Sequence, residues 1–297
     1  MDWAEEDLAK PQVLVDLAMA RCNMSAIHLP GGSQLNAPDY VTSNQLWTTG
    51  MAVERGELSK EDFEQAERVA CPTCGACQFM GSASIGQVIS EALGLALPGS
   101  ALVPAPLTQL LRYARATGKQ VLKLIEEEIT PGRILTREAF ENTIVIHAAV
   151  GGSTNMLLHL PLIAREAGVE ITIDDFDRIH RQVPVLANVK TTGRYPVEYF
   201  WYAGGVPAIM LELRDMLHLD CLTVTGKTLG ENLVGQLQGI ASTEGQWRMI
   251  VTIECSSFSS GIGPPVYHLL LTYATTAMRK LSKVRTPFTS CKGQNFA

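Results

Sequence analysis

Apolar residues recur at the spacing of one helix face along most of residues 11–233. The segments that this spacing predicts to be helical are 11–23, 59–70, 84–97, 107–129, 136–150, 155–168, 174–183 and 203–216. Gly118 interrupts the longest of them, which is therefore predicted to form either two helices or one long helix.

Polar and turn-forming residues mark the expected ends of these helices. Ser59, Thr136 and Asp174 stand where an N-terminal cap is needed, because their side-chain oxygens can accept from the free N–H groups of a first helical turn. Pro98-Gly99 and Gly168 are expected to end the helices that precede them.

Short apolar runs stand between or after several of the helices, at 25–32, 171–173, 185–189 and 221–226. Strands that alternate with helices of about 10–15 residues are typical of an α/β domain with a largely parallel sheet. After Asn232 this alternation is lost. We therefore predict an α/β domain over residues 1–233 and a tail of unrelated origin over residues 234–297.

Composition supports a folded chain of this kind. The 297 residues carry a net charge of −6, and 46% of them are hydrophobic and 18% charged. Disordered chains combine low hydrophobicity with high net charge, and general nucleic-acid binders are basic, so both classes are excluded. The charge is uneven, with −10 over residues 1–233 and +4 over residues 234–297, which supports a separate origin for the tail.

Nothing in the sequence directs the chain to a membrane or to secretion. Residues 266–278, the most apolar late stretch, are interrupted by His268 and fall short of the ~18 consecutive apolar residues of a membrane span. The first ten residues are acidic where a secretory signal would be basic, and seven cysteines are too few for a disulfide scaffold. We expect a cytoplasmic protein, and the mitochondrial or plastid matrix stays open as an alternative.

Three cysteines recur at a spacing of three in Cys71-Pro-Thr-Cys74-Gly-Ala-Cys77, hereafter the CPTCGAC loop. Thiolates bind iron and zinc, and a helix that begins after the loop would favour negative charge there, so an iron–sulfur or zinc site is favoured. Three thiols do not complete a set of four ligands. A redox pair at Cys71 and Cys74, or buried cysteines in a tight turn, are the alternatives.

A second candidate site is Gly151-Gly152-Ser153-Thr154-Asn155, hereafter the GGSTN loop, between two predicted helices. Successive backbone N–H groups at a helix start, with two hydroxyls and an amide, can bind a carboxylate or phosphate. The alternative is that Ser153 or Asn155 only caps the next helix. His147 and His159 flank the loop, and each is expected to be a helix histidine with satisfied hydrogen bonds rather than a base.

A glycine-bearing turn, Leu29-Pro30-Gly31-Gly32-Ser33, follows the first predicted strand. Ligands of open α/β sheets bind at the carboxyl ends of strands, so this turn is a third candidate. It could equally be a turn alone.

Several segments, taken in order, resemble the dihydroxy-acid dehydratase and sugar-acid dehydratase family, which also includes 6-phosphogluconate dehydratase. The resemblance covers residues of about 10 to 233, and CQFMGSAS and AGGVP are closest to its aldonate or xylonate branch. The segments that carry it are GACQFMGSAS, EALGLALPGSALVPA, ILTREAFENTIVIHAAVGGSTNMLLHLPLIAREAG, DDFDRI, AGGVP and TVTGKTLGENL.

The resemblance implies a layered α/β/α N-terminal domain with a largely parallel sheet, followed in the family by a β-rich domain. It implies a lyase that removes water from a 2,3-dihydroxy carboxylate through an enol and leaves a 2-oxo acid. The implied cofactors are a [2Fe–2S] or [4Fe–4S] cluster, whose open iron acts on the 3-hydroxyl, and Mg²⁺, which holds the carboxylate and 2-hydroxyl. The implied partner is a small polyhydroxy acid, with neither nucleic acid nor membrane, in a homodimer or larger assembly.

Individual residues are carried over only where the motifs match. Cys77 matches the third cluster cysteine of the family, while Cys71 and Cys74 are additional thiols close by. The family's Cys-Asp-Lys triplet reads Leu8-Ala9-Lys10 here, which leaves Lys10 as the carbamylated magnesium ligand. Ser153, Thr154 and Asn155 are the candidates for substrate binding.

Other parts of the family pattern have no counterpart in this sequence. These are the segment with the first cluster cysteine and the C-terminal domain with a metal-binding Glu and the serine base. We therefore expect a chain truncated at both ends, inactive by itself, whose catalytic residue is unknown. The alternative function is a non-catalytic domain that binds a metal or a partner through the CPTCGAC loop.

Overall fold

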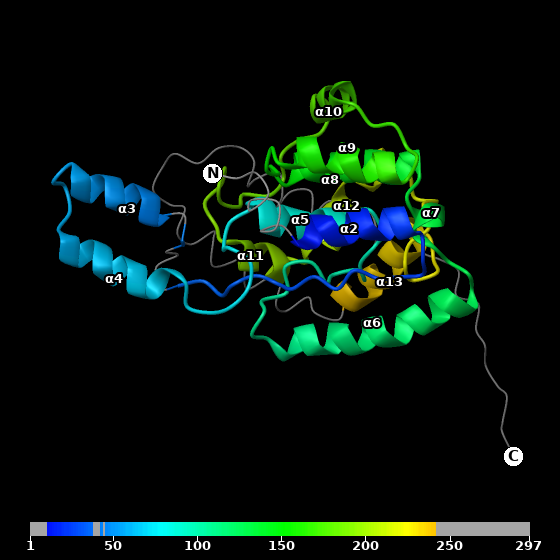
Figure 1. Cartoon of the computed structure of the whole chain (residues 1–297), viewed down its shortest axis with the longest axis horizontal. Helices are drawn as coiled ribbons and strands as arrows, with labels where there is room; N and C mark the ends of the chain where they lie inside the picture. Colours follow the sequence, from blue (N-terminus) through cyan, green and yellow to red (C-terminus); the bar gives the residue numbers. More distant parts are fainter. Residues whose placement is uncertain (1–10, 38–41, 44, 242–297) are drawn as a thin grey trace, which may run out of the picture. The chain divides into compact units, whose positions relative to one another are not determined.

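Each segment with helical spacing forms a helix in the computed structural model, which describes residues 11–37, 42–43 and 45–241 (Figure 1). All of these residues belong to one compact unit, Met1–Arg248. The predicted helices are α2 (Pro11–Cys22), α4 (Lys60–Ala70), α5 (Ser82–Ala92), α6 (Thr108–Glu126), α8 (Arg137–Ala149), α9 (Met156–Glu166), α10 (Ile173–His180) and α12 (Gly205–Glu212), the last followed by the 3₁₀ turn η2 (Arg214–Met216). Gly118 does not divide α6, which is one helix.

Other helices were not expected from the apolar pattern. They are α3 (Gln45–Glu54), α7 (Pro131–Ile134), α11 (Val197–Tyr202) and α13 (Leu229–Ala241). Helices α7 and α11 are too short for a periodic pattern, and α3 contains two threonines and a glycine, which are weak helix formers. Helix α13 continues past residue 233. The predicted division of the chain there stays a prediction, because residues 242–297 lie outside the described residues.

The predicted caps are confirmed at two of three positions. The Ser59 hydroxyl accepts from Asp62 N (3.1 Å), and the Thr136 hydroxyl accepts from Ala139 N (3.3 Å). Asp174 was wrong as a cap, because α10 begins at Ile173 and its N-cap is Thr172. Asp175 instead reaches back to accept from Thr172 N at 3.0 Å.

Helix α5 ends before the position that the sequence predicted. Its C-terminal turn closes at Gly94, in the left-handed conformation (φ +80°), with Leu95 N donating to Ser90 O (2.9 Å). This is the usual glycine C-terminal motif. The prediction that Pro98-Gly99 ends the helix was therefore wrong, while Gly168 (φ +74°) follows α9 as expected.

The layered sheet that was expected is not confirmed. In the described part of the chain, extended segments pair only at isolated bridges, His28–Ala96, Ser33–Ala76, Ser33–Pro104, Val189–Tyr195 and Leu222–Thr228. Of the four predicted strands, three contribute one bridging residue each, and the run 171–173 leads directly into α10. Apolar runs of three to eight residues do not distinguish a strand from a buried loop, and here they serve as loops between packed helices.

Helices α5 and α8 form the centre of the core. Nine of the 11 residues of α5 and ten of the 13 residues of α8 are buried, and the two helices contact each other. Helix α5 also contacts α2, α9 and α12 (Figure 1). Most residues of α5 are apolar or small, as burial on all sides requires, and Gln87 and Glu91 are larger polar residues that are buried with hydrogen-bond partners. None of the described helices is both long and apolar enough to cross a bilayer.

A buried polar contact joins α2 to α5. The His28 ring donates from Nδ1 to Asp16 Oδ1 (2.7 Å), and the Ser90 hydroxyl donates to Asp16 Oδ2 (2.5 Å). Asp16, His28 and Ser90 are 1%, 4% and 0% exposed. The Ser90 hydroxyl also lies within hydrogen-bond distance of Gly86 O (2.8 Å), so it keeps an acceptor without Asp16. Since buried polar groups are costly when left unpaired, His28 Nδ1 is the donor that depends on Asp16.

We predict that Asp16→Ala lowers the free energy of unfolding by about 3 kcal/mol, because the buried His28 Nδ1 loses its acceptor and the bond from Ser90 is lost as well. Ser90→Ala is the matched control, which keeps the bond from His28 and should cost about 1 kcal/mol. Urea unfolding of both variants measures the difference. Equal losses for the two variants would contradict the role given to Asp16.

Candidate active site

The CPTCGAC loop is held in place by hydrogen bonds to the turn at residues 29–33 and the residues after it. Ala76 N donates to Gly32 O (2.9 Å), Gln34 N donates to Ala76 O (2.8 Å), and Leu35 N donates to the Thr73 hydroxyl (2.9 Å). Gly75 has a φ of +122°, and a Cβ there would lie 2.5 Å from the carbonyl carbon of Ser33. The glycine is therefore required for this close approach.

The three thiols of the CPTCGAC loop are accessible to solvent. Cys71, Cys74 and Cys77 are exposed, and none is in a disulfide. The alternative of buried cysteines in a tight turn is therefore wrong. Within the described ranges, no three His, Cys, Asp or Glu side chains converge on a common metal position. Lys10 lies outside the described residues, so its predicted role as a magnesium ligand stays a prediction.

The GGSTN loop joins α8 to α9 and contacts the first residue of α5. The Asn155 amide donates to the Ser82 hydroxyl, and Ser82 lies five residues after Cys77 in the chain. Ser84, in the same helical turn, donates to Cys77 O (3.0 Å). The first turn of α5 thus contacts both candidate motifs, which lie more than 70 residues apart in the sequence.

The capping alternative for the GGSTN loop is weaker in the structure. The Asn155 side chain makes no capping bond to α9, and the Ser153 hydroxyl accepts only a long bond from Asn155 N (3.4 Å). Thr154 is exposed, while Ser153 and Asn155 are half-buried. Their roles in substrate binding stay predictions.

The N-terminus of α5 is suited to an anion. Gly81 precedes the helix and has no side chain with which to cap it, and residues 81–83 are half-buried. The N–H groups of a first helical turn carry a partial positive charge, and they bind carboxylates and phosphates when no side chain caps them. The Ser82 hydroxyl, which the residue pattern alone did not single out, stands at this position.

His147 lies under the GGSTN loop with both ring nitrogens in use. Nε2 is 3.0 Å from Ser153 O, and Nδ1 is 3.2 Å from His180 Nε2. Burial lowers the pKa of His147 to about 4, so the ring is neutral near pH 7. This agrees with the expected helix histidine with satisfied hydrogen bonds. His159 is half-buried on α9, and its role stays a prediction.

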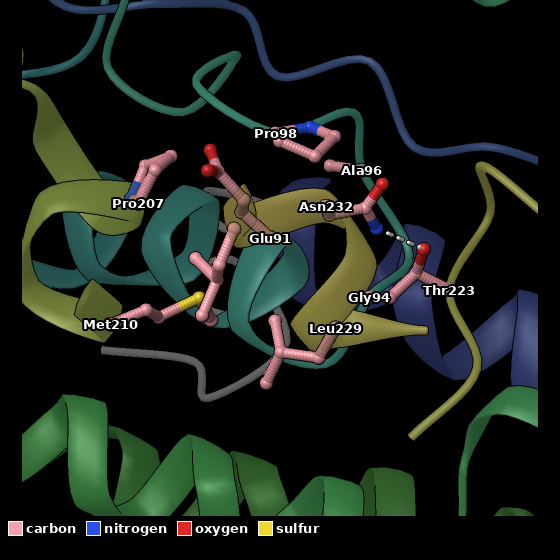
Figure 2. A pocket seen from close by; sticks show the side chains of 10 residues that line it. Glu91, Gly94, Ala96, Pro98, Pro207, Met210, Thr223, Leu229 and Asn232 are labelled. Atoms are coloured by element: carbon pink, nitrogen blue, oxygen red, sulfur yellow. Dashed lines mark hydrogen bonds between the residues drawn. The ribbon is translucent and has the colours of Figure 1, made fainter. Parts of the chain in front are cut away.

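A separate cavity lies near the opposite end of α5. The centre of a water molecule can occupy a volume of about 20 Å³ within it, so the cavity holds roughly one water. Figure 2 shows the residues that line it, among them Glu91, Pro207, Thr223 and Asn232, whose amide donates to the Thr223 hydroxyl (2.8 Å). A polyhydroxy acid is far larger than this space.

Glu91 is a fully buried carboxyl group at this cavity. It accepts from Gly99 N (2.6 Å) and Ala101 N (2.8 Å), yet burial raises the pKa of Glu91 to about 7. Burial also raises the pKa of nearby Tyr113 to about 12, with the charge of Glu91 adding to the shift. Glu91 therefore exchanges its proton near neutral pH.

We predict that the free energy of unfolding falls as the pH rises from about 4.5 to about 7. In this range the unfolded chain has released the Glu91 proton and the folded chain still holds it, so the folded state binds more protons. The expected loss is about 3 kcal/mol, following the shift from 4.5 to about 7. Urea unfolding at several pH values measures it.

Glu91→Gln should remove this part of the pH dependence, since the amide does not titrate. Glu126→Gln, at an exposed position on α6, is the matched control and should leave the slope as it is. An unchanged slope in Glu91→Gln would refute the assignment to this carboxyl group.

Comparison with known proteins identifies the family. Residues 7–232 match the family description "Dihydroxy-acid/6-phosphogluconate dehydratase N-terminal". The chain therefore belongs to this dehydratase family, which confirms the resemblance read from the motifs. The matched region contains the CPTCGAC loop, α5 and the GGSTN loop.

Similar curated proteins carry two kinds of name. The chain is 43% identical over 222 residues to a dihydroxy-acid dehydratase of Caldanaerobacter subterraneus subsp. tengcongensis, covering 73% of this chain and 40% of that protein. It is 46% identical over 233 residues to a dihydroxy-acid dehydratase of Acidothermus cellulolyticus, covering 76% and 41%. It is 44% identical over 233 residues to the D-xylonate dehydratase YjhG of Escherichia coli (strain K12), covering 76% and 35%. The aligned region spans about two fifths of these relatives.

Proposed function

We propose that the chain forms part of a hydro-lyase that removes water from a 2,3-dihydroxy carboxylate and leaves a 2-oxo acid. Family membership and the names of its relatives support this activity. The contact from Asn155 to Ser82 is the observation that carries the proposal furthest. It joins the amide group of the GGSTN loop to the first residue of α5, a helix whose first turn also contacts Cys77 through Ser84.

In this proposal the start of α5 binds the substrate carboxylate. The N–H groups of its first turn donate to the carboxylate, and the helix dipole favours the negative charge. Ser153, Thr154 and Asn155 then donate to or accept from the hydroxyls of the polyhydroxy acid. These residues bind and orient the substrate, and no described residue is assigned as the base.

The cofactors that the family resemblance implies are an iron–sulfur cluster and Mg²⁺. Cys77 would supply one thiolate to the cluster, with Cys71 and Cys74 as nearby thiols, and Lys10 would bind magnesium. The described residues do not fit either group by themselves, because no three metal-binding side chains converge among them. No step of the reaction is therefore derived through a cofactor.

The substrate class has two candidates within this proposal. The relatives are named for a dihydroxy acid and for D-xylonate, and the CQFMGSAS motif is closer to the sugar-acid branch. We propose a small polyhydroxy acid as the ligand, a homodimer or larger assembly for the complete enzyme, and a cytoplasmic location.

A second candidate function rests on the exposed thiols. Cys71, Cys74 and Cys77 are exposed on a loop whose backbone is hydrogen-bonded to residues 32–35, so the thiols are accessible to a soft metal or to a partner. Stoichiometric zinc, bound without iron and lost when all three cysteines are replaced by serine, would favour this function. Iron–sulfur absorbance in the reconstituted chain would count against it.

We predict that residues 11–232 of this chain can replace the matching segment of the E. coli D-xylonate dehydratase with retention of iron binding and turnover. The reason is that the proposed substrate contacts all lie within this segment. A second chimera with residues 7–232 introduces Leu8-Ala9-Lys10 and is expected to lose turnover, since two of three positions of the family's Cys-Asp-Lys triplet change. Iron and sulfide analysis with a 2-oxo acid assay measures both. If the first chimera unfolds cooperatively, binds iron and yet gives no turnover, the proposed function is refuted.

The contact between Asn155 of the GGSTN loop and Ser82 of α5 can be tested in the active chimera. Asn155→Ala should raise the KM for D-xylonate by about tenfold, because an amide that orients the substrate is lost. Ser82→Ala and the double variant complete a cycle, and the two changes should be less than additive because the side chains are in contact. Strict additivity, or an unchanged KM in Asn155→Ala, would contradict a shared site.

A further inference from the structure

The GGSTN loop contacts a pair of histidines, of which His147 is buried and His180 is half-buried. His147, near the end of α8, is 3% exposed, and its ring stacks on that of His180 in α10 with 5.2 Å between centroids and 17° between planes. Phe176 lies edge-on to both rings, at 6.0 Å from His147 and 5.7 Å from His180. This packing leaves the two imidazoles little freedom to move.

The hydrogen bonds determine where the protons must be. Ser153 O is a carbonyl oxygen that can only accept, so His147 must carry a proton on Nε2. Because His147 is neutral, its Nδ1 is then an acceptor, and the proton between the rings belongs to His180 Nε2. His180 thereby holds His147 in the tautomer that can bind the loop.

The loop is shaped around the His147 ring. A Cβ on Gly152 would lie 2.4 Å from His147 Cδ2 and 2.7 Å from Nε2, so only glycine allows the backbone this close. Ser153 O, which accepts from His147, also accepts from Met156 N (3.1 Å) in the first turn of α9. The same carbonyl therefore fixes both the loop and the start of the next helix, on either side of Asn155.

We propose that His147 is a positioning residue for the GGSTN loop, and that His180 keeps it in the required tautomer. The proposal rests on the proposed function in one respect, namely that this loop contacts the substrate. His147 touches the loop backbone and is kept from solvent, so it acts through Ser153 and Asn155 rather than on a substrate.

Two variants separate the two ring nitrogens. In His147→Gln the amide nitrogen takes the place of Nε2 and can still donate to Ser153 O. In His147→Asn the amide reaches only the place of Nδ1, so the bond to the loop is lost. Amide hydrogen exchange of residues 151–156 in the 297-residue chain should stay close to wild type in His147→Gln. It should rise by about tenfold in His147→Asn, while exchange in α5 stays unchanged.

The proposal is overturned if both variants exchange alike, or if exchange rises equally in α5 and in the loop. A second measurement needs no variant. The imidazole ¹⁵N shifts of the wild-type chain should show His147 and His180 both protonated on Nε2, and an Nδ1-protonated His147 would also overturn the proposal.

Substrate binding is measured separately by calorimetry with D-xylonate and with 2,3-dihydroxyisovalerate on the active chimera. We expect the affinity to fall by about tenfold in His147→Asn and to be kept in His147→Gln. Equal affinity in both variants refutes the proposal that His147 positions the GGSTN loop for substrate binding. Failure of the unsubstituted chimera to bind either acid refutes the proposed function instead, and the exchange and tautomer results still decide the role of His147.

Discussion

The burial of helix α5 is the constraint on which the rest of the structure depends. Its polar side chains must find partners inside the core, because an unpaired buried polar group is costly. Gln87, which is fully buried, accepts from Gly32 N (3.0 Å) and Leu102 N (3.2 Å) and donates to Gly32 O (3.0 Å). The turn at residues 29–33, considered above as a ligand site, is thereby held by the core. Gly32 O also accepts from Ala76 N in the CPTCGAC loop, so the buried amide of Gln87 helps to fix the loop that bears Cys77.

Most of the described helices were predicted from the sequence, whereas the sheet that it also predicted is not confirmed. Amphipathic helices such as α6 and α10 show one apolar face along many residues, and this period is a direct result of burial on one side. The run at 171–173 is too short for such a period to repeat. It leads into α10, because Thr172 and Asp175 form a cap that an apolar pattern does not reveal. The end of α5 was misjudged for a similar reason, since Gly94 and the proline four residues later are both helix-ending signals and the nearer one prevails.

Of the candidate site, the sequence revealed the loops but not their contacts. The CPTCGAC and GGSTN loops stand out because cysteine spacing and consecutive glycines have chemical meaning within a few residues. The contact of Asn155 with Ser82 and the pairing of His147 with His180 join segments that lie far apart in the chain, and no local pattern encodes them. His147 could be noticed only as a histidine in an apolar helix. Its partner became apparent only when α8 and α10 were seen to pack together.

The direction of α5 explains why its two ends behave differently. Its N-terminus, at Ser82, carries the positive end of the helix dipole and meets both candidate loops, so negative charge is favoured there. Glu91 lies in the last turn, where the dipole disfavours a negative charge and burial adds to the cost. Backbone N–H groups of Gly99 and Ala101 offset part of that cost, but the carboxyl group still keeps its proton to about pH 7. A single buried helix therefore excludes negative charge at one end and attracts it at the other. This polarity supports the proposal that an anionic substrate binds at the start of α5 rather than at the cavity beside Glu91.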